Sequence, residues 1–403
     1  NPNIIAPSGV GQPTPIVQTP DGTIVPTTPV ITTFPTISMD YGPRGEPLPR
    51  DDWETFAVGS AACPNWMLFQ SDADGDWDVY RLNQDTGSIN NVSQGDGSSD
   101  IQVSFSADGK WAVFTTNRAG LGNWELWISS IDGEDQRRVT FNTAADVNPV
   151  WGPGNLIAFE SNRDGNWELY LFDVSGDGLP VRLTDDPASD INPFWMPDGE
   201  HIVFQSDRDG DWELYRLNVT TGELQPLTNN QRRDVSPVVS HDGTQLAWLQ
   251  QNDFGVFDLM LMNLATNAIR QLTDMGVDVD GQVFAPDDTF IAFHTNLDGD
   301  YDVFAVEIET GRIKNATDND DFQDWAPSFW CSGPAIVYQS DAADTPENPG
   351  QRELFEVLPL PFDGLANTPV QLTDDPLADD IYPQGEAREE RNSREGAIPL
   401  PLP

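Results

Sequence analysis

Short apolar runs alternate with clusters of turn-forming residues along most of the chain, and the alternation returns at a fixed interval. One apolar residue marks each return: Phe69, Phe114, Phe159, Phe204, Leu249, Phe293 and Tyr338. The successive steps are 45, 45, 45, 45, 44 and 45 residues. Spacing this regular indicates seven copies of one structural repeat.

Each copy contains four apolar runs, which in the third copy read LIAFES, WELYLF, PVRLT and INPFWM. The runs are rich in Val, Ile, Phe, Trp and Tyr, and none has a helical period with caps, so they are predicted to be strands. Four strands per repeat of this length are typical of a propeller blade. The predicted fold class is all-β: a seven-bladed β-propeller of four-stranded antiparallel blades, with extended N- and C-terminal tails.

The repeat resembles the TolB-type, WD-like β-propeller repeat. The shared pattern is a Pro-aromatic strand, a Pro-Asp-Gly turn, an Ile-x-Phe-x-Ser strand, an Asp-Gly loop, a Tyr-ending strand and Leu-Thr. Here it reads NPFWMPDGEHIVFQSDRDGDWELYRLN from Asn192, followed by Leu227-Thr228. The resemblance covers roughly residues 52–386. It implies the fold more than a function, because this fold serves many roles.

Three segments follow from the repeats: a Pro/Thr-rich extended arm (1–50), the propeller (51–386) and a C-terminal tail (387–403). An aspartate opens each predicted first strand, and one such strand is surplus: Asp52, Asp100, Asp146, Asp190, Asp234, Asp278, Asp324 and Asp380. Either residues 380–386 or residues 53–58 complete blade one, and the sequence leaves both open.

Cys63 and Cys331 are the only cysteines. Each follows a first strand, in repeats that become neighbours when the ring closes. We predict a Cys63–Cys331 disulfide that clasps the ring, stabilising it by roughly 5 kcal/mol in the chain-entropy model. It would imply an oxidising compartment outside the cytoplasm. The alternative is two unrelated buried thiols.

An acid recurs early in each third strand: Asp78, Glu125, Glu168, Glu213, Asp258, Asp302 and Glu353. Seven equivalent acids indicate a structural hydrogen-bond bracket, because a half-buried carboxylate needs partners. The expected partners are backbone N–H groups and a hydroxyl at the end of the second strand: Ser71, Thr116, Ser161, Ser206, Thr295 and Ser340.

The stretch SDADGDWDVY (71–80) invites a comparison with calcium loops. Its glycine falls at position 4 from Asp72, and position 12 is Asn83, so it fails as an EF-hand. The main interpretation is a solvated hairpin turn. The alternative is another type of calcium site, in blades one and four: Asp72, Asp74, Asp76, Asp207, Asp209 and Asp211.

The formal charge is −46, with 66 acidic and 20 basic residues. A chain this acidic repels nucleic acid and anionic membranes, and no window is apolar enough for a membrane span. The sequence begins at Asn1 rather than Met, which is compatible with a removed leader.

Three histidines, His201, His241 and His294, fall at different blade positions and lack metal-ligand spacing. No G-x-S-x-G elbow occurs. We therefore expect that the chain is not an enzyme and needs no cofactor, with calcium as the alternative above.

The N-terminal arm carries Ile/Val runs on both sides of Pro20-Asp21-Gly22, which favours a hairpin or a pair of extended segments. Its apolar residues could pair with an exposed strand of a neighbouring copy: Ile16, Val17, Ile24, Val25, Val30, Ile31 and Phe34. The charged C-terminal tail is a second candidate docking arm.

Two functions remain. The first is a non-enzymatic extracellular or cell-surface structural protein that self-associates, as a filament or surface layer, through the arm. The alternative is a monomeric secreted or periplasmic propeller that binds a protein or glycan partner.

Overall fold

The structure is a computed structural model of the chain. It describes residues 65–72, 75–95, 97–120, 123–176, 178–297, 299–318, 322–331, 333, 335–342, 353–357 and 369–373, together with the backbone of 17–18, 24–25 and 380–384. Every regular element in this part of the chain is a β-strand. The chain divides into two compact units, residues 1–43 and 44–403. The predicted borders at 50/51 and 386/387 lie outside the described residues and stay predictions.

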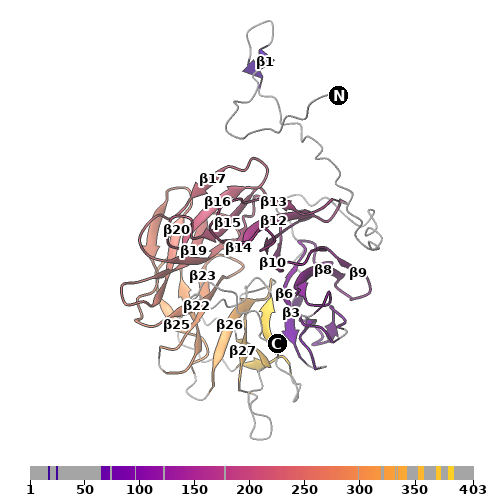
Figure 1. Cartoon of the computed structure of the whole chain (residues 1–403). Coiled ribbons are helices and arrows are strands. Elements are labelled where there is room, and N and C mark those ends of the chain that lie inside the picture. Colours follow the sequence, from indigo (N-terminus) through magenta and orange to yellow (C-terminus); the bar gives the residue numbers. More distant parts are fainter. Residues whose placement is uncertain are drawn as a thin grey trace, which may run out of the picture. The chain divides into compact units, whose positions relative to one another are not determined.

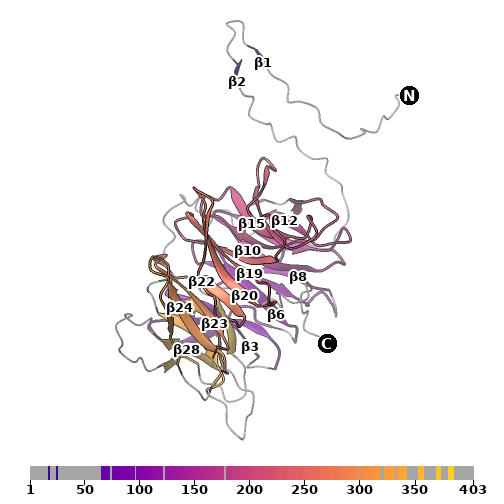
Figure 2. The same cartoon turned by 90° about the vertical axis from the view of Figure 1, so that its left-hand side faces the viewer.

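The second unit contains seven four-stranded antiparallel sheets, which are the blades (Figures 1 and 2). Blade one comprises β30 (Asp380–Gln384), β3 (Trp66–Ser71), β4 (Asp78–Asn83) and β5 (Ile89–Asn91). Blade two comprises β6 (Asp100–Phe105), β7 (Trp111–Thr116), β8 (Glu125–Ser130) and β9 (Gln136–Arg138). Blade three comprises β10 (Asp146–Trp151), β11 (Leu156–Ser161), β12 (Glu168–Asp173) and β13 (Val181–Arg182). Blade four comprises β14 (Asp190–Trp195), β15 (His201–Ser206), β16 (Glu213–Asn218) and β17 (Leu224–Pro226). Blade five comprises β18 (Asp234–Val239), β19 (Gln245–Gln251), β20 (Phe257–Asn263) and β21 (Ala268–Gln271). Blade six comprises β22 (Val279–Phe284), β23 (Phe290–Thr295), β24 (Asp302–Glu307) and β25 (Ile313–Asn315). Blade seven comprises β26 (Asp324–Phe329), β27 (Ile336–Ser340), β28 (Glu353–Val357) and β29 (Val370–Gln371).

The C-terminal end of the propeller sequence closes the ring. β30 pairs with β3, with Gln70 opposite Ile381 and Ser71 opposite Asp380. β30 also lies against β26, β27 and β28 of blade seven, and Figure 1 shows this yellow strand beside indigo β3. Of the two closures that the sequence allowed, the one through residues 380–384 is confirmed. Residues 53–58 lie outside the described residues.

The repeat markers form the cores of the blades. Phe69, Phe114, Phe159, Phe204 and Phe293 are at most 1% exposed, and several stack on an aromatic of the third strand, as Phe159 does on Tyr170 at 5.7 Å. Burying such a side chain stabilises the fold by about 1.5–3 kcal/mol. In blade five the predicted marker was wrong by one residue. Trp248 pairs with Met260 in the register that joins Phe204 to Tyr215, so Trp248 rather than Leu249 is the marker.

A bulge in each first strand links neighbouring blades. Its residue has positive φ, as at Gln102 (54°), Asn192 (54°) and Ser236 (54°), and the ladder register shifts there. In blades two, four and five the freed backbone N–H bonds to a side chain of the previous blade's second strand. Asn192 donates to Glu160 Oε1 at 2.8 Å, and Ser236 donates to Gln205 Oε1 at 2.8 Å. The bulge therefore directs a backbone donor across the junction between blades.

Blade six departs from the expected opening aspartate. β22 starts at Val279, which pairs with Thr295 at the end of the second strand. In blade four the equivalent pair is Asp190 and Ser206. Asp278 precedes the strand and accepts a hydrogen bond from the Phe257 N–H at 3.0 Å. The expectation that an aspartate opens every first strand is therefore wrong in blade six. In the other six blades the first strand does begin with aspartate.

The first unit contains a small hairpin of β1 (Val17–Gln18) and β2 (Ile24–Val25). Val17 pairs with Val25, and Gln18 pairs with Ile24. The hairpin predicted around Pro20-Asp21-Gly22 is confirmed for these four residues. The other arm residues named above, Ile16, Val30, Ile31 and Phe34, lie outside the described residues.

Candidate binding face

One face of the propeller collects the recurring acids. The first strand starts, the second ends and the third starts at this face, because successive strands are antiparallel. The loops between second and third strands and the links between blades lie here too. We call it the carboxylate face. The turns between first and second strands, and between third and fourth strands, lie on the opposite face.

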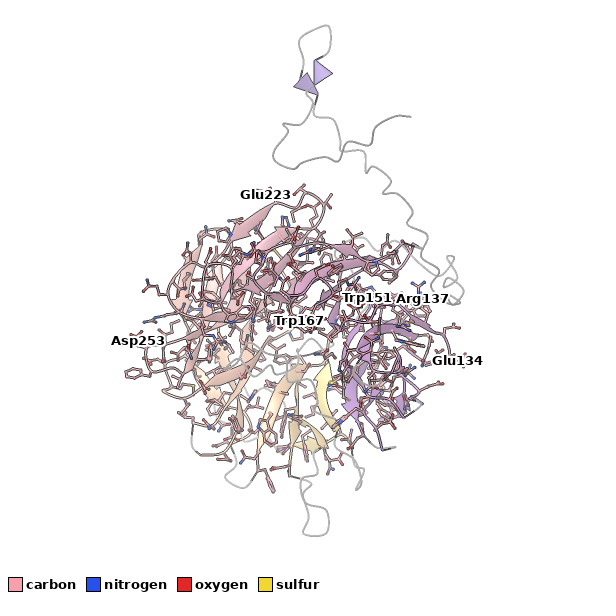
Figure 3. All side chains as sticks on the ribbon, viewed as in Figure 1. Glu134, Arg137, Trp151, Trp167, Glu223 and Asp253 are labelled. Atoms are coloured by element: carbon pink, nitrogen blue, oxygen red, sulfur yellow. The ribbon has the colours of Figure 1, made fainter. Side chains whose placement is uncertain are left out.

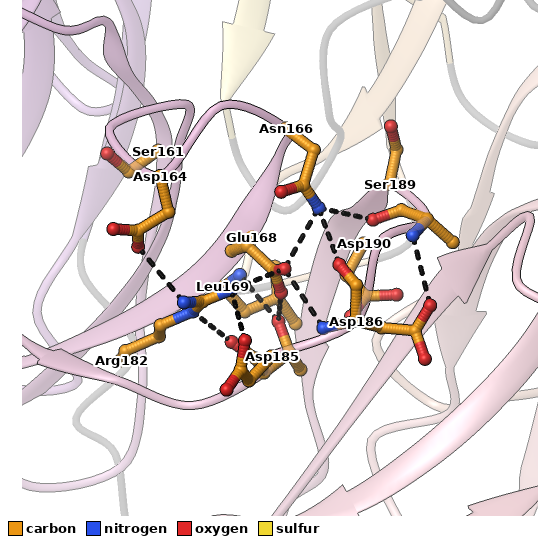
Figure 4. Close-up of polar contacts among 12 residues, drawn as sticks. Ser161, Asp164, Asn166, Glu168, Leu169, Arg182, Asp185, Asp186, Ser189 and Asp190 are labelled. Atoms are coloured by element: carbon orange, nitrogen blue, oxygen red, sulfur yellow. Dashed lines mark hydrogen bonds and ion pairs between the residues drawn. The ribbon is translucent and has the colours of Figure 1, made fainter.

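The third-strand acids are buried and bracketed by a hydroxyl. Thr184 donates to Glu168 Oε2 at 2.6 Å, and its oxygen accepts the Leu169 N–H at 2.9 Å. Ser93 and Asp78 repeat this arrangement in blade one, and Thr317 and Asp302 repeat it in blade six. Figure 4 shows the other bonds of Glu168, from Asn166, Arg182 and the Asp186 N–H. The predicted bracket is confirmed as a structural device.

The hydroxyl partner that the sequence predicted was wrong. The bracket hydroxyl comes from the Ser/Thr that follows the fourth strand, which is the threonine of the Leu-Thr motif. The hydroxyls at the ends of second strands serve the first-strand aspartates instead, as Thr116 does for Asp100 and Ser206 for Asp190. Strand register places Ser206 directly between Asp190 and Glu213. The Thr228 hydroxyl bonds to Glu213, which leaves the Ser206 hydroxyl for Asp190.

Arginines neutralise the first-strand aspartates in blades two to four. Each arginine comes from the loop between second and third strands and folds back over the blade's aromatics: Arg118–Asp100 at 2.5 Å, Arg163–Asp146 at 2.7 Å and Arg208–Asp190 at 2.8 Å. The aspartate side chains are 0% exposed. These clamps were not predicted from the sequence, although the arginine recurs in SNRDG and SDRDG and is a usable signal.

Buried carboxylates also approach one another across blade junctions. The aromatic residue that precedes a third strand accepts, through its backbone carbonyl, the N–H of the next blade's first aspartate. For example, the Asp190 N–H donates to the Trp167 carbonyl at 2.8 Å. Burial raises the pKa of Asp100 to about 7, and the Arg118 bonds counteract this only in part. Burial likewise raises the pKa of Glu213 to about 7, and the nearby Asp234 carboxylate adds to the rise. Removing a carboxylate from water disfavours its charged form.

The proposed calcium ligands of blade four have separate partners. Asp207 accepts the Ser189 N–H at 2.8 Å, and Asp209 accepts the Tyr215 hydroxyl. Burial raises the pKa of Asp211. No group of three or more His, Cys, Asp or Glu suited to a metal occurs among the described residues. In blade one, Asp72 and Asp76 are described and Asp74 is not. The calcium site stays a prediction.

The predicted disulfide involves a residue outside the described part of the chain. Cys331 comes two residues after the end of β26, next to the buried Trp330. Cys63 lies outside the described residues, so the pairing stays a prediction.

Comparison with known proteins agrees with this architecture. The model of the TolB β-propeller domain matches residues 153–332. This part of the propeller is of the TolB type. The Tol-Pal system protein TolB of Francisella tularensis subsp. mediasiatica is 26% identical over 212 residues, which cover 50% of this chain and 48% of that protein. The chain therefore spans about half the length of this curated relative.

Other similar proteins are enzymes or parts of enzymes. The uncharacterized peptidase YuxL of Bacillus subtilis is 25% identical over 181 residues, 43% of this chain and 25% of that protein. The propeller domain of the Trilobed protease from Pyrococcus furiosus aligns with TM-score 0.56 and 15% identity, over 77% of this chain and 95% of that one. An oligogalacturonate lyase in complex with manganese aligns with TM-score 0.53 and 14% identity, over 73% and 83%.

These likenesses overturn the expectation that the chain is not an enzyme. The solved structures show the shared fold, and that fold occurs in a lyase and in peptidases. Histidines without metal-ligand spacing and the missing G-x-S-x-G elbow are therefore no ground for excluding catalysis. Within the described residues, no helix is long and apolar enough to cross a membrane.

Proposed function

We propose that the chain is a TolB-like propeller that binds a cationic protein through its carboxylate face. One observation supports this most: on this face the clamping arginines are largely buried, whereas carboxylates of the loops and links are exposed. Arg118 and Arg208 are 8% and 15% exposed because each clamps a buried aspartate. The side chains of Asp185 and Asp253, in contrast, are 86% and 79% exposed. A face built in this way attracts positive charge and steers a cationic partner toward it.

We place this propeller in the periplasm, with an extracellular location as the alternative. The likeness to TolB supports this, and so does the predicted Cys63–Cys331 disulfide, which would need an oxidising compartment.

The binding role is tested by selecting ligands from a random peptide library displayed on phage, with the full-length chain as bait. Selected peptides are titrated against the wild type, Asp185→Lys on the carboxylate face and Glu134→Lys on the opposite face (Figure 3 labels Glu134). We expect cationic peptides whose affinity falls with added NaCl and with the Asp185 change, and is unaltered by the Glu134 change. Failure to enrich any peptide, or equal effects of the two substitutions, contradicts the proposal.

Self-association through the arm is the second candidate, and the β1–β2 hairpin favours it. Before Asp40 the arm carries a single charged residue, Asp21. Copies of a chain with charge −46 repel one another, so a nearly uncharged segment suits contact between copies. Sedimentation of the full chain should show association that rises with concentration, and the double variant Val17→Lys, Val25→Lys should reduce it. A wild type that stays monomeric at every concentration contradicts this candidate.

A further inference from the structure

Blade five departs from the repeat in the loop between its second and third strands. In blades three and four the residue before the loop glycine is Asp164 or Asp209, and its carboxylate accepts a hydrogen bond from a tyrosine hydroxyl of the third strand. In blade five Phe254 stands before Gly255, and Met260 replaces the tyrosine. The polar latch is lost, and the side chain that replaces the aspartate is 92% exposed.

The loop that displays Phe254 is held firmly. Asn252 Oδ1 accepts the Phe254 N–H at 2.9 Å, while the Asn252 N–H bonds to the Val256 carbonyl at 2.8 Å. The Asn252 amide also donates to the buried Asp258 at 2.9 Å. Asp253 pairs with Arg232 of the preceding link at 2.8 Å. Phe254 is thus presented to solvent by an ordered turn, and a rigid anchor loses little conformational entropy on binding.

Among the described residues, the exposed large apolar side chains on the carboxylate face are confined to one sector. Leu297, in the corresponding loop of blade six, is 45% exposed, and Phe322, in the link to blade seven, is 37% exposed. The other large hydrophobic residues exposed in the described part of the chain lie on or beside the outermost strands: Ile89, Leu179, Val181, Leu224, Ile269 and Val370. Blades five and six are neighbours in the ring.

The same sector has lost its clamping arginines. The position of Arg163 and Arg208 is occupied by Asp253 in blade five and by Leu297 in blade six. Asp253 is 79% exposed, and Figure 3 shows it at the outer margin of its blade. Blade five thus places an exposed aromatic beside an exposed carboxylate in this loop, whereas the clamped blades three and four carry an arginine and an aspartate there.

We propose that Phe254 and Leu297 form the docking site for a cationic protein segment whose apolar side chains cover Phe254. The inference rests on the proposed function and names the part of the face that carries it. A central aromatic that becomes fully desolvated supplies most of the affinity of many interfaces. Complementary charge around it gives orientation and a fast association rate. Because the chain carries a net charge of −46, it attracts a basic partner toward this sector and repels an acidic one.

The test compares Phe254→Ala with a matched exposed apolar change, Ile269→Ala, on the outermost strand β21. Ile269 is 53% exposed and lies off the carboxylate face. Peptides selected on the full-length wild-type chain are titrated against both variants. We expect peptides with net positive charge and apolar residues, whose dissociation constant rises about tenfold or more with Phe254→Ala and stays unchanged with Ile269→Ala. Thermal unfolding should be the same for all three proteins, because both side chains are exposed.

The outcomes separate this site from the wider binding role. Cationic peptides that bind Phe254→Ala as tightly as the wild type overturn the Phe254 site and leave a binding propeller. Acidic or neutral peptides overturn the cationic partner. The absence of any enriched peptide overturns the proposed function itself.

Discussion

Glu213 of blade four and Asp234 of blade five meet carboxyl to carboxyl across the junction between their blades. Asn230 bonds to both: its backbone N–H donates to Glu213 Oε1, and its amide donates to Asp234 Oδ2 at 2.6 Å. Both acids are at most 1% exposed. Burial, with the nearby Asp234 carboxylate adding to it, raises the pKa of Glu213 and favours its protonated form.

The Glu213–Asp234 pair predicts a pH dependence of stability. The folded pKa of Glu213 is raised to about 7 from an ordinary value of 4.5. The folded state therefore holds a proton that the unfolded state releases between these two values, and the free energy of unfolding falls as pH rises through this window. Glu213→Gln removes the titration. Urea unfolding should show the variant gaining stability relative to the wild type between pH 4.5 and about pH 7; a constant difference would contradict the raised pKa of Glu213.

The Arg208–Asp190 clamp predicts a large cost for losing the arginine. Arg208→Ala leaves Asp190, which is 0% exposed, without its cation, and breaking a buried pair costs about 3–5 kcal/mol. The control is Arg312→Ala, whose pair with Glu307 lies at the surface, with Arg312 56% exposed, and its loss should cost far less, because water screens an exposed pair. Equal losses in chemical unfolding would show that the clamp is not structural.

The packing of Gly152 under Trp195 predicts intolerance of a methyl group. A Cβ at Gly152 would lie 2.3 Å from the Trp195 ring, whereas one at Gly178 would meet nothing within 4 Å. Neither glycine has the positive φ that strains other residues. Gly152→Ala should lower the free energy of unfolding by about 1–3 kcal/mol through overpacking, and Gly178→Ala should leave it unchanged or slightly higher. A Gly152→Ala protein as stable as the wild type would mean that the ring moves aside freely.

The predicted Cys63–Cys331 disulfide is checked by mass spectrometry of a non-reducing digest. A peptide pair joined through these cysteines is expected, and reduction should lower the unfolding midpoint. Cys331→Ser should reproduce the effect of reduction. Two free thiols in alkylated, unreduced protein would refute the disulfide.

The predicted calcium site is checked by titrating calcium into the wild type and into Asp207→Asn, Asp211→Asn. A site at blade four requires heat of binding that the double variant loses, and a thermal midpoint that rises with calcium in the wild type only. Equal behaviour of both proteins would leave the Asp-Gly loop as a solvated turn.

The sequence by itself determined the number and type of the repeats. A period near 45 residues and the alternation of apolar positions are local properties, because each blade buries an aromatic residue at the equivalent position against its own third strand. The acid of the third strand was also readable, since a carboxylate that recurs at a buried position must be satisfied within the repeat. Trp248 shows the limit: a change of one residue in spacing moved the marker, and only strand pairing located it.

The tertiary structure decided everything that depends on which strands become neighbours. The sequence contained a surplus first strand, and pairing of β30 with β3 selected the one from the distant end of the chain. In the folded blades Ser206 bonds to Asp190, and Thr184 bonds to Glu168. The sequence pattern alone is equally compatible with a second-strand hydroxyl that bonds to the third-strand acid. The exposure of Phe254 is likewise a tertiary property: the letters show an aromatic in a loop, and only the folded blade shows that no part of it covers the ring.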